Sequence, residues 1–120
     1  MNSKPAEFSL VVRGLRLSGM SWGSSDLPPL VALHGWLDNA QSFSYLAPLI
    51  LHRQVIALDL PGHGFSEHRS EGTPHYISEY AIDVLHAIEQ LNGPVDLIGH
   101  SMGAGVASCI ASGMPKAIKS

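Results

Sequence analysis

Ser101 stands at the centre of Gly-His-Ser-Met-Gly, residues 99–103, the segment with the strongest chemical signal in the sequence. Glycines two residues before and two residues after a serine are typical of a nucleophile elbow, a tight turn that raises the serine hydroxyl above a sheet. Gly99 and Gly103 fit this turn because a side chain at either position would collide with it. A serine hydroxyl becomes a good nucleophile only beside a general base, so the spacing predicts part of a site for nucleophilic catalysis.

Apolar segments of strand length precede this motif and two others. Residues 30–33 are followed by His-Gly-Trp at 34–36, and residues 55–58 by Asp-Leu-Pro-Gly-His-Gly-Phe-Ser at 59–66. Residues 95–98 lead into Gly99 in the same way. Continuous apolar runs of this length indicate buried parallel strands. Since the carboxyl ends of parallel strands meet at one edge of a sheet, the three motifs are expected to lie together there.

The remaining elements complete an α/β pattern. Residues 8–13 and 15–22 partly alternate in polarity and predict a β-hairpin around Gly14. Apolar residues at helical spacing predict three helices, over residues 38–50, over 77–91 and from the elbow to about 112. The order β-β-β-α-β-α-β-α predicts a doubly wound fold with a mostly parallel sheet.

Composition narrows the class of protein. The 120 residues carry a net charge of −3 and no basic stripe, so nucleic acid is not an expected partner. Cys109 is the single cysteine, which suits a reducing compartment. The apolar runs are too short to cross a membrane, and residues 1–7 lack the apolar stretch of a signal peptide. We therefore expect a cytoplasmic protein that does not bind membranes.

Together the three motifs resemble the α/β-hydrolase superfamily. The motif His-Gly-Trp-Leu-Asp-Asn at 34–39 is most similar to the serine hydrolase-like branch of this superfamily. The resemblance covers residues 8–120. It implies that residues 1–120 form the N-terminal part of a single α/β-hydrolase domain, truncated before the later strands, with a flexible start at 1–7. Residues 117–119 would begin the next parallel strand. The resemblance implies no cofactor and no metal ion.

The resemblance also implies roles for particular residues. Ser101 matches the nucleophile, and the backbone N–H groups of Trp36 and Met102 match the oxyanion hole. The elbow and the oxyanion loop would be shaped by five further residues: His34, Gly35, Gly99, His100 and Gly103. The alternative for Ser101 is that its hydroxyl caps the helix that follows it.

Other titratable residues have competing interpretations. His34 is not assigned as the general base, because in the family this position shapes the oxyanion loop. His100 is expected to pack against neighbouring strands, and His63 and His75 to be structural or solvated. Asp59 is expected to lock its own turn through hydrogen bonds to nearby backbone groups. The family's acid and histidine would follow residue 120, so we expect the chain to be an incomplete fragment without efficient catalysis.

Three functions remain open from the sequence. The first is a serine hydrolase that cleaves an ester, thioester or related acyl bond of a small molecule. The second keeps the fold and changes the chemistry to carbon–carbon bond hydrolysis, perhydrolysis or acyl transfer. The third is a short, non-catalytic binding protein. Ser101 argues against haloalkane dehalogenase and epoxide hydrolase activity, because those relatives carry aspartate at this position. The oligomeric state is left open.

Overall fold

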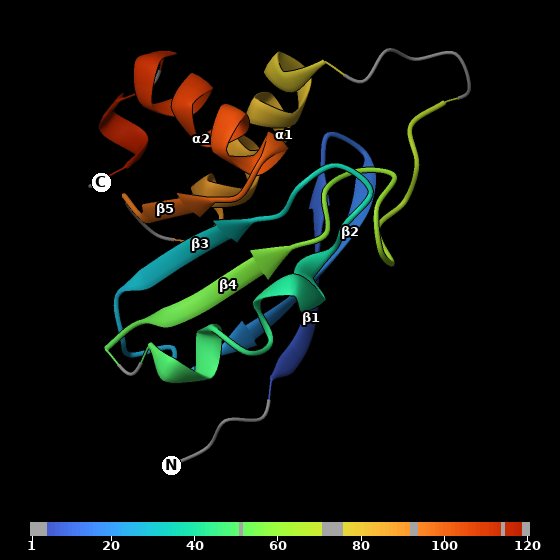
Figure 1. Cartoon of the computed structure of the whole chain (residues 1–120). Helices are drawn as coiled ribbons and strands as arrows, with labels where there is room; N and C mark the ends of the chain where they lie inside the picture. The colour runs from blue at the N-terminus through green and yellow to red at the C-terminus, as the bar shows by residue number, and fades with distance from the viewer. Residues whose placement is uncertain (1–4, 51, 71–75, 92–93, 114, 119–120) are drawn as a thin grey trace.

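The computed structural model describes residues 5–50, 52–70, 76–91, 94–113 and 115–118, which contain one five-stranded mixed sheet (Figure 1). Its strands, in chain order, are β1 (Ala6–Val12), β2 (Leu15–Trp22), β3 (Pro29–Leu33), β4 (Gln54–Leu58) and β5 (Asp96–Gly99). The spatial order is β1-β2-β4-β3-β5. β3 is parallel to both β4 and β5, whereas β2 is antiparallel to β1 and β4. The predicted α/β fold is confirmed, with the hairpin adding an antiparallel half to the parallel strands.

A two-residue turn closes the β1–β2 hairpin. Arg13 and Gly14 both have positive φ angles, of 49° and 82°. Two consecutive positive φ angles are typical of the tight turns whose twist matches a hairpin. The first strand begins at Ala6, so the predicted flexible start is wrong for Ala6 and Glu7, which pair with β2. Residues 1–4 lie outside the described chain.

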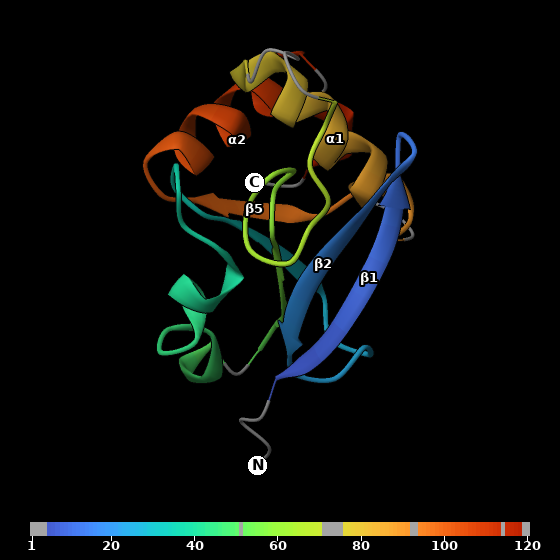
Figure 2. The ribbon, with the colours of Figure 1, turned by 90° about the vertical axis from the view of Figure 1, so that its right-hand side faces the viewer.

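The helices cover the two faces of the sheet unequally. α1 (Ile77–Glu89) and α2 (Met102–Gly113) lie on one face, and two short 3-10 helices, η1 (Ala40–Phe43) and η2 (Ala47–Leu49), lie on the other (Figure 2). The helix predicted over residues 38–50 is therefore wrong. Pro48 explains the difference, since it lacks an N–H donor and its ring disfavours the interior of an α-helix.

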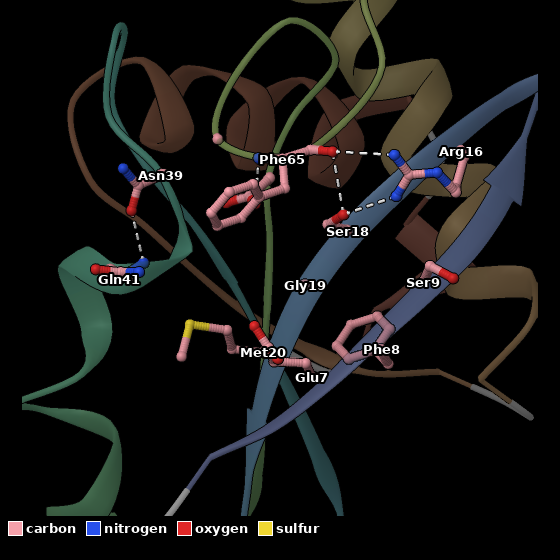
Figure 3. A pocket seen from close by; sticks show the side chains of 12 residues that line it. Glu7, Phe8, Ser9, Arg16, Ser18, Gly19, Met20, Asn39, Gln41 and Phe65 are labelled. Carbon is pink, nitrogen blue, oxygen red and sulfur yellow. Dashed lines mark hydrogen bonds between the residues drawn. The ribbon is translucent and has the colours of Figure 1, made fainter.

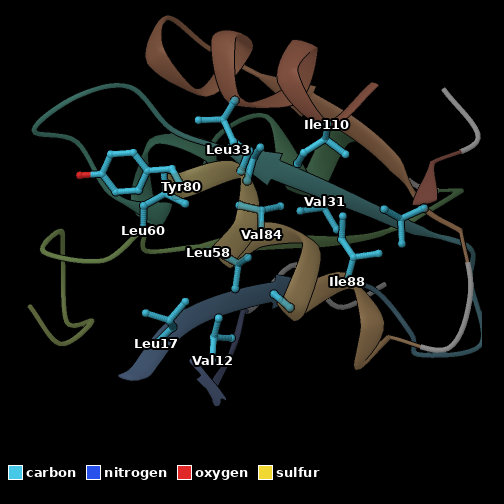
Figure 4. Packing of buried hydrophobic residues seen from close by; sticks show 14 residues of the cluster. Val12, Leu17, Val31, Leu33, Leu58, Leu60, Tyr80, Val84, Ile88 and Ile110 are labelled. Carbon is cyan, nitrogen blue, oxygen red and sulfur yellow. The ribbon is translucent and has the colours of Figure 1, made fainter. Parts of the chain in front are cut away.

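Strand residues alternate between two apolar cores. Val31 and Leu33 face α1 and α2, whereas Ala32 between them packs with η1 and η2. Figure 4 shows the larger core, in which Val84 and Ile88 of α1 lie among the strand residues and Tyr80 lies beside Leu60. Burying a side chain such as valine or leucine contributes about 1.5–3 kcal/mol. The larger core therefore fixes α1 and α2 over the strands that carry the three motifs.

The chain beyond α2 returns to the edge of the sheet. Residues Pro115–Ala117 form a 3-10 turn, η3, and Ile118 makes a parallel bridge to Val95. The Val95 N–H donates to the Ala117 carbonyl at 3.1 Å. The predicted parallel strand is thus confirmed at Ile118 and wrong at Ala117, while Lys119 lies outside the described residues.

Candidate active site

Ser101 occupies a strained turn between β5 and α2. Its φ angle is 58°, a left-handed conformation that a non-glycine residue rarely adopts. A Cβ at Gly99 would collide with the Gly103 carbonyl, and a Cβ at Gly103 with the Leu33 carbonyl. The expectation that neither glycine could carry a side chain is confirmed. The glycines let β5, α2 and β3 approach closely enough to hold the serine backbone in this conformation.

The Ser101 side chain is exposed at the start of α2. Its carbonyl accepts hydrogen bonds from Ala104 and Gly105, at 3.0 and 3.3 Å, which begin the helix. Among the described hydrogen bonds, none involves its Oγ. The serine therefore starts the helix through its backbone and not as a side-chain cap. Met102 is the first helical residue, and an N–H at this position has no intrahelical acceptor.

The loop after β3 lies directly against this turn. A Cβ placed on Gly35 would be 3.2 Å from the Ser101 Cβ. The Asp38 N–H donates to the Gly35 carbonyl at 3.1 Å, which closes a turn in which Leu37 has a φ of 62°. Trp36 follows Gly35, and its side chain is 51% exposed. Two strained non-glycine residues, Leu37 and Ser101, therefore lie on neighbouring loops.

His34 is fully buried and uses both ring nitrogens within the protein. Its Nδ1–H donates to the Gly35 carbonyl at 2.7 Å, and its Nε2 accepts from the Leu60 N–H at 3.0 Å. These partners define a neutral imidazole, because a proton on Nε2 would break the bond from Leu60. Burial lowers the pKa of His34 below its ordinary value of 6.5. A histidine without a free lone pair cannot take the Ser101 proton, so His34 supports the loop.

His100 differs from the prediction, because its side chain is exposed and not packed among strands. Its N–H continues the pairing with β3 by donating to the Leu33 carbonyl at 3.0 Å. Its Nδ1 lies 3.7 Å from the Cβ position of Gly35. The pKa of the nearby Asp38 is lowered, first by a hydrogen bond from the Ser42 hydroxyl and next by one from the Asn39 N–H.

Asp59 holds the loop that follows β4. Its Oδ1 accepts the Ala40 N–H at 2.7 Å, and its Oδ2 accepts the Phe65 N–H at 3.0 Å. The carboxylate occupies the space beside Gly64 that a side chain there would need. The prediction that Asp59 locks its turn is confirmed. The bond to Ala40 was not predicted, because it joins segments that are far apart in the sequence.

Ser66 ties the same loop to β2. Its hydroxyl donates to the Asp59 carbonyl and accepts the Ser18 N–H at 2.8 Å. The Glu67 N–H also donates to the Arg16 carbonyl, at 2.9 Å. We call residues 59–67 the latch loop, because these bonds close it on both sides.

His63 is the site neighbour whose contacts the sequence did not indicate. It is 6% exposed and its ring lies 5.0 Å from that of His34, 5.3 Å from Trp36 and 6.0 Å from Tyr80, between ring centroids. Of the two roles expected for His63, structural or solvated, the structure confirms the structural one. His75 lies outside the described residues.

A pocket of about 530 Å³ lies between the β1–β2 hairpin and the latch loop (Figure 3). Phe8 and Met20 from the hairpin, Gln41 from η1 and Phe65 from the latch loop are among its lining residues. Neither Ser101, Trp36 nor Met102 lines it. The pocket is therefore separate from the candidate active site.

Comparisons with known proteins place the fold and the motifs in one family. The profile of the alpha/beta hydrolase fold family matches residues 28–120. A serine hydrolase-like protein of Danio rerio is 37% identical over 122 residues, covering 100% of this chain and 37% of that protein. A serine hydrolase-like protein of Dictyostelium discoideum is also 37% identical, over 88% of this chain and 31% of its own length.

Solved structures agree with the sequence comparison. The thioesterase domain from the curacin biosynthetic pathway superposes with a TM-score of 0.90 at 34% identity, covering 97% of this chain and 42% of that one. The chain belongs to the alpha/beta hydrolase fold family. It spans about a third of the length of the two serine hydrolase-like relatives. In the described ranges, no helix is both long and apolar enough to cross a membrane.

Proposed function

We propose that this chain supplies the nucleophile and the oxyanion hole of a serine hydrolase that cleaves an ester, thioester or related acyl bond. One observation carries the proposal: Ser101, with its exposed hydroxyl, sits in a left-handed turn against the loop that carries Trp36. The serine hydrolase-like relatives and the hydrolase fold support a hydrolase in general. The nature of the bond is our inference from Ser101 and from the thioesterase among the solved structures.

The reaction follows from the proposed roles. Ser101 Oγ attacks the carbonyl carbon of the substrate while a general base takes its proton. The negative charge that develops on the carbonyl oxygen is stabilised by the backbone N–H groups of Trp36 and Met102. One well-placed donor of this kind lowers the barrier by about 3 kcal/mol. The proton then passes to the leaving group as the acyl–serine ester forms, and water, deprotonated by the same base, releases the acid and restores Ser101.

We propose that the base and its carboxylate partner come from outside residues 1–120. Both His34 ring nitrogens are engaged, and His63 is buried with its Nδ1–H directed to the Pro61 carbonyl at 3.1 Å. His100 adjoins Ser101 in the chain, and no hydrogen bond between the two side chains occurs among the described contacts. Residues 1–120 alone would therefore lack efficient turnover. A cytoplasmic location stays a prediction for cell fractionation to test.

A fluorophosphonate probe tests the proposal, because it labels an activated serine in a hydrolase. Two proteins would be labelled, residues 1–120 and the complete gene product, each also as Ser101→Ala. Ser108→Ala is the matched control, since Ser108 is an exposed serine on α2. We expect labelling of the complete gene product, its loss in Ser101→Ala alone, and labelling of residues 1–120 that is slower by about 10⁴-fold or more.

Other outcomes would redirect the assignment. Labelling that survives Ser101→Ala would refute the nucleophile. Absence of labelling in every protein would favour a non-catalytic binding protein. Labelling at Ser101 without hydrolysis of simple esters or thioesters would favour carbon–carbon bond hydrolysis, perhydrolysis or acyl transfer on the same fold.

A further inference from the structure

His63 connects the latch loop to the loop that carries the proposed oxyanion donor. Its ring lies edge-on to the Trp36 indole, with 75° between the two planes and 5.3 Å between their centroids. The same ring lies 5.0 Å from His34, at 49°. Edge-to-face contacts at these separations are favourable. His63 therefore packs against two residues of the segment that follows β3.

The orientation of this ring is set from the opposite side. Its Nδ1 lies 3.1 Å from the Pro61 carbonyl, an acceptor, so Nδ1 carries the proton. Pro61 stands between Asp59 and His63 in the latch loop. The bonds of Asp59 and Ser66 fix that loop to Ala40 and to β2. A continuous set of contacts thus runs from the sheet through Pro61 and His63 to Trp36.

The second ring nitrogen of His63, Nε2, makes no hydrogen bond with the described chain that would stabilise the fold. Within the described residues, His63 Nε2 is buried and has no hydrogen-bond partner. A buried acceptor without a donor destabilises a fold, and a phenyl ring of similar size would avoid that penalty. The imidazole therefore has a use other than packing, and the bond that only it can make here is the one from Nδ1–H to Pro61.

We propose that His63 is a positioning residue that holds Trp36, and with it the oxyanion loop, in place beside Ser101. This inference rests on the proposed function, because it assigns His63 an effect on the reactivity of Ser101. His63 does not touch the reacting atoms. It determines where the Trp36 backbone N–H lies when the carbonyl oxygen of the substrate becomes negative.

The experiment compares three variants of the complete gene product by fluorophosphonate labelling and by Trp36 fluorescence. His63→Ala removes both the ring and the hydrogen bond, and His63→Phe restores the ring alone. His68→Ala is the matched control, since His68 is an exposed histidine that directly follows the latch loop. The Trp36 signal is isolated by subtracting the spectrum of a Trp36→Phe variant. Thermal melting verifies that each protein is folded at the temperature of the assay.

We expect His63→Ala to lower the labelling rate at Ser101 by about 10- to 100-fold, because small displacements of a catalytic group have effects of that size. The loss should lie in the inactivation rate constant and not in the binding constant of the probe. Acrylamide should quench Trp36 more strongly in the same variant. His63→Phe should melt no lower than the wild type, but it should recover only part of the labelling rate and of the Trp36 signal, because its ring lacks the bond to the Pro61 carbonyl. His68→Ala should match the wild type.

The failures of the two proposals are distinguishable. If the wild-type protein is labelled at Ser101 and His63→Ala is labelled at the same rate, His63 has no positioning role and the proposed function stands. If His63→Phe is labelled as slowly as His63→Ala, ring packing against Trp36 does not hold the loop. If the wild-type protein is not labelled, the proposed function fails and this inference fails with it.

Discussion

The latch loop follows β4 and the Ser101 turn follows β5, and the two loops differ in whether their polar side chains are hydrogen-bonded within the protein. In the latch loop, Asp59 and Ser66 satisfy backbone donors on both sides of the chain. In the Ser101 turn, the hydroxyl makes no hydrogen bond within the described chain, and the backbone is strained at Ser101, as it is at Leu37 on the neighbouring loop. The first region stabilises the edge of the sheet, and the second leaves a hydroxyl there without a hydrogen-bond partner in the described chain.

This contrast shows where the protein tolerates strain. A left-handed non-glycine residue costs about 1–2 kcal/mol, and such residues persist where their surroundings overdetermine them. The satisfied latch loop and the close approach of α2 to β3 supply those surroundings. Substitutions that remove these surroundings are therefore expected to lower the free energy of unfolding, whereas a substitution that relieves strain is expected to raise it.

The largest effect is expected at the close approach beneath the Ser101 turn. Gly103→Ala should lower the free energy of unfolding by about 3 kcal/mol, because the new Cβ would collide with the Leu33 and His34 carbonyls. Gly113→Ala, at the other end of α2, meets nothing within 4 Å and should raise it by up to about 1 kcal/mol. Urea denaturation of the complete gene product measures both. Equal effects of the two substitutions would contradict the role of the close approach.

In the latch loop, Asp59→Ala should lower the free energy of unfolding by about 2 kcal/mol, since it leaves the Ala40 and Phe65 N–H groups without their acceptor. Asp26→Ala, at an exposed aspartate, is the control and should be neutral. The same denaturation experiment distinguishes them. A neutral Asp59→Ala would mean that the latch loop does not depend on this carboxylate.

Acid should weaken the contact at His34 between the latch loop and the loop that follows β3. Because burial lowers the pKa of His34 in the folded protein, the unfolded chain takes up its proton first. Stability contributed by neutral His34 is complete above pH 6.5 and is lost as the pH falls from there toward the folded-state pKa. His34→Asn should flatten this slope when denaturation is measured from pH 7.5 to pH 5. An unchanged slope would assign the acid sensitivity to another group.

The smallest effect, of opposite sign, is expected where the strain is exposed. Leu37→Asn should raise the free energy of unfolding by about 0.5 kcal/mol, because asparagine adopts positive φ more readily than leucine. Leu46→Asn is the matched control, since Leu46 is an exposed leucine with a φ of −79°. A loss of stability at Leu37 would show that its side chain makes a contact worth more than the strain.

Local patterns in the sequence predict much of the fold. The apolar runs predict β3, β4 and β5, the spacing in 77–91 predicts α1, and Gly99 and Gly103 predict the turn at Ser101. The helix predicted over residues 38–50 is wrong because Pro48 has no N–H to continue the hydrogen bonding of an α-helix, although the apolar spacing favours one. The polarity of the neighbouring residues also does not indicate that His100 is exposed.

The contacts that join the motifs could not be predicted from the sequence. Asp59 to Ala40, His34 to Leu60 and His63 to Trp36 each connect segments that meet only after the strands have paired. Their geometry depends on strand order and register, which periodicity does not encode. The roles of Trp36 and Met102 stay predictions, because their N–H groups act on an oxygen atom that only a substrate supplies.

Ser101 contributes to the fold through its backbone hydrogen bonds, whereas its side chain makes none within the described residues. The turn is built by the glycines around it and by the carbonyl that starts α2, so the hydroxyl can be exchanged without rebuilding any neighbour. Ser101→Cys or Ser101→Asp would place a thiol or a carboxylate where the hydroxyl now stands. The side chain at this position can therefore change while the glycines of the turn and the residues of the core stay as they are.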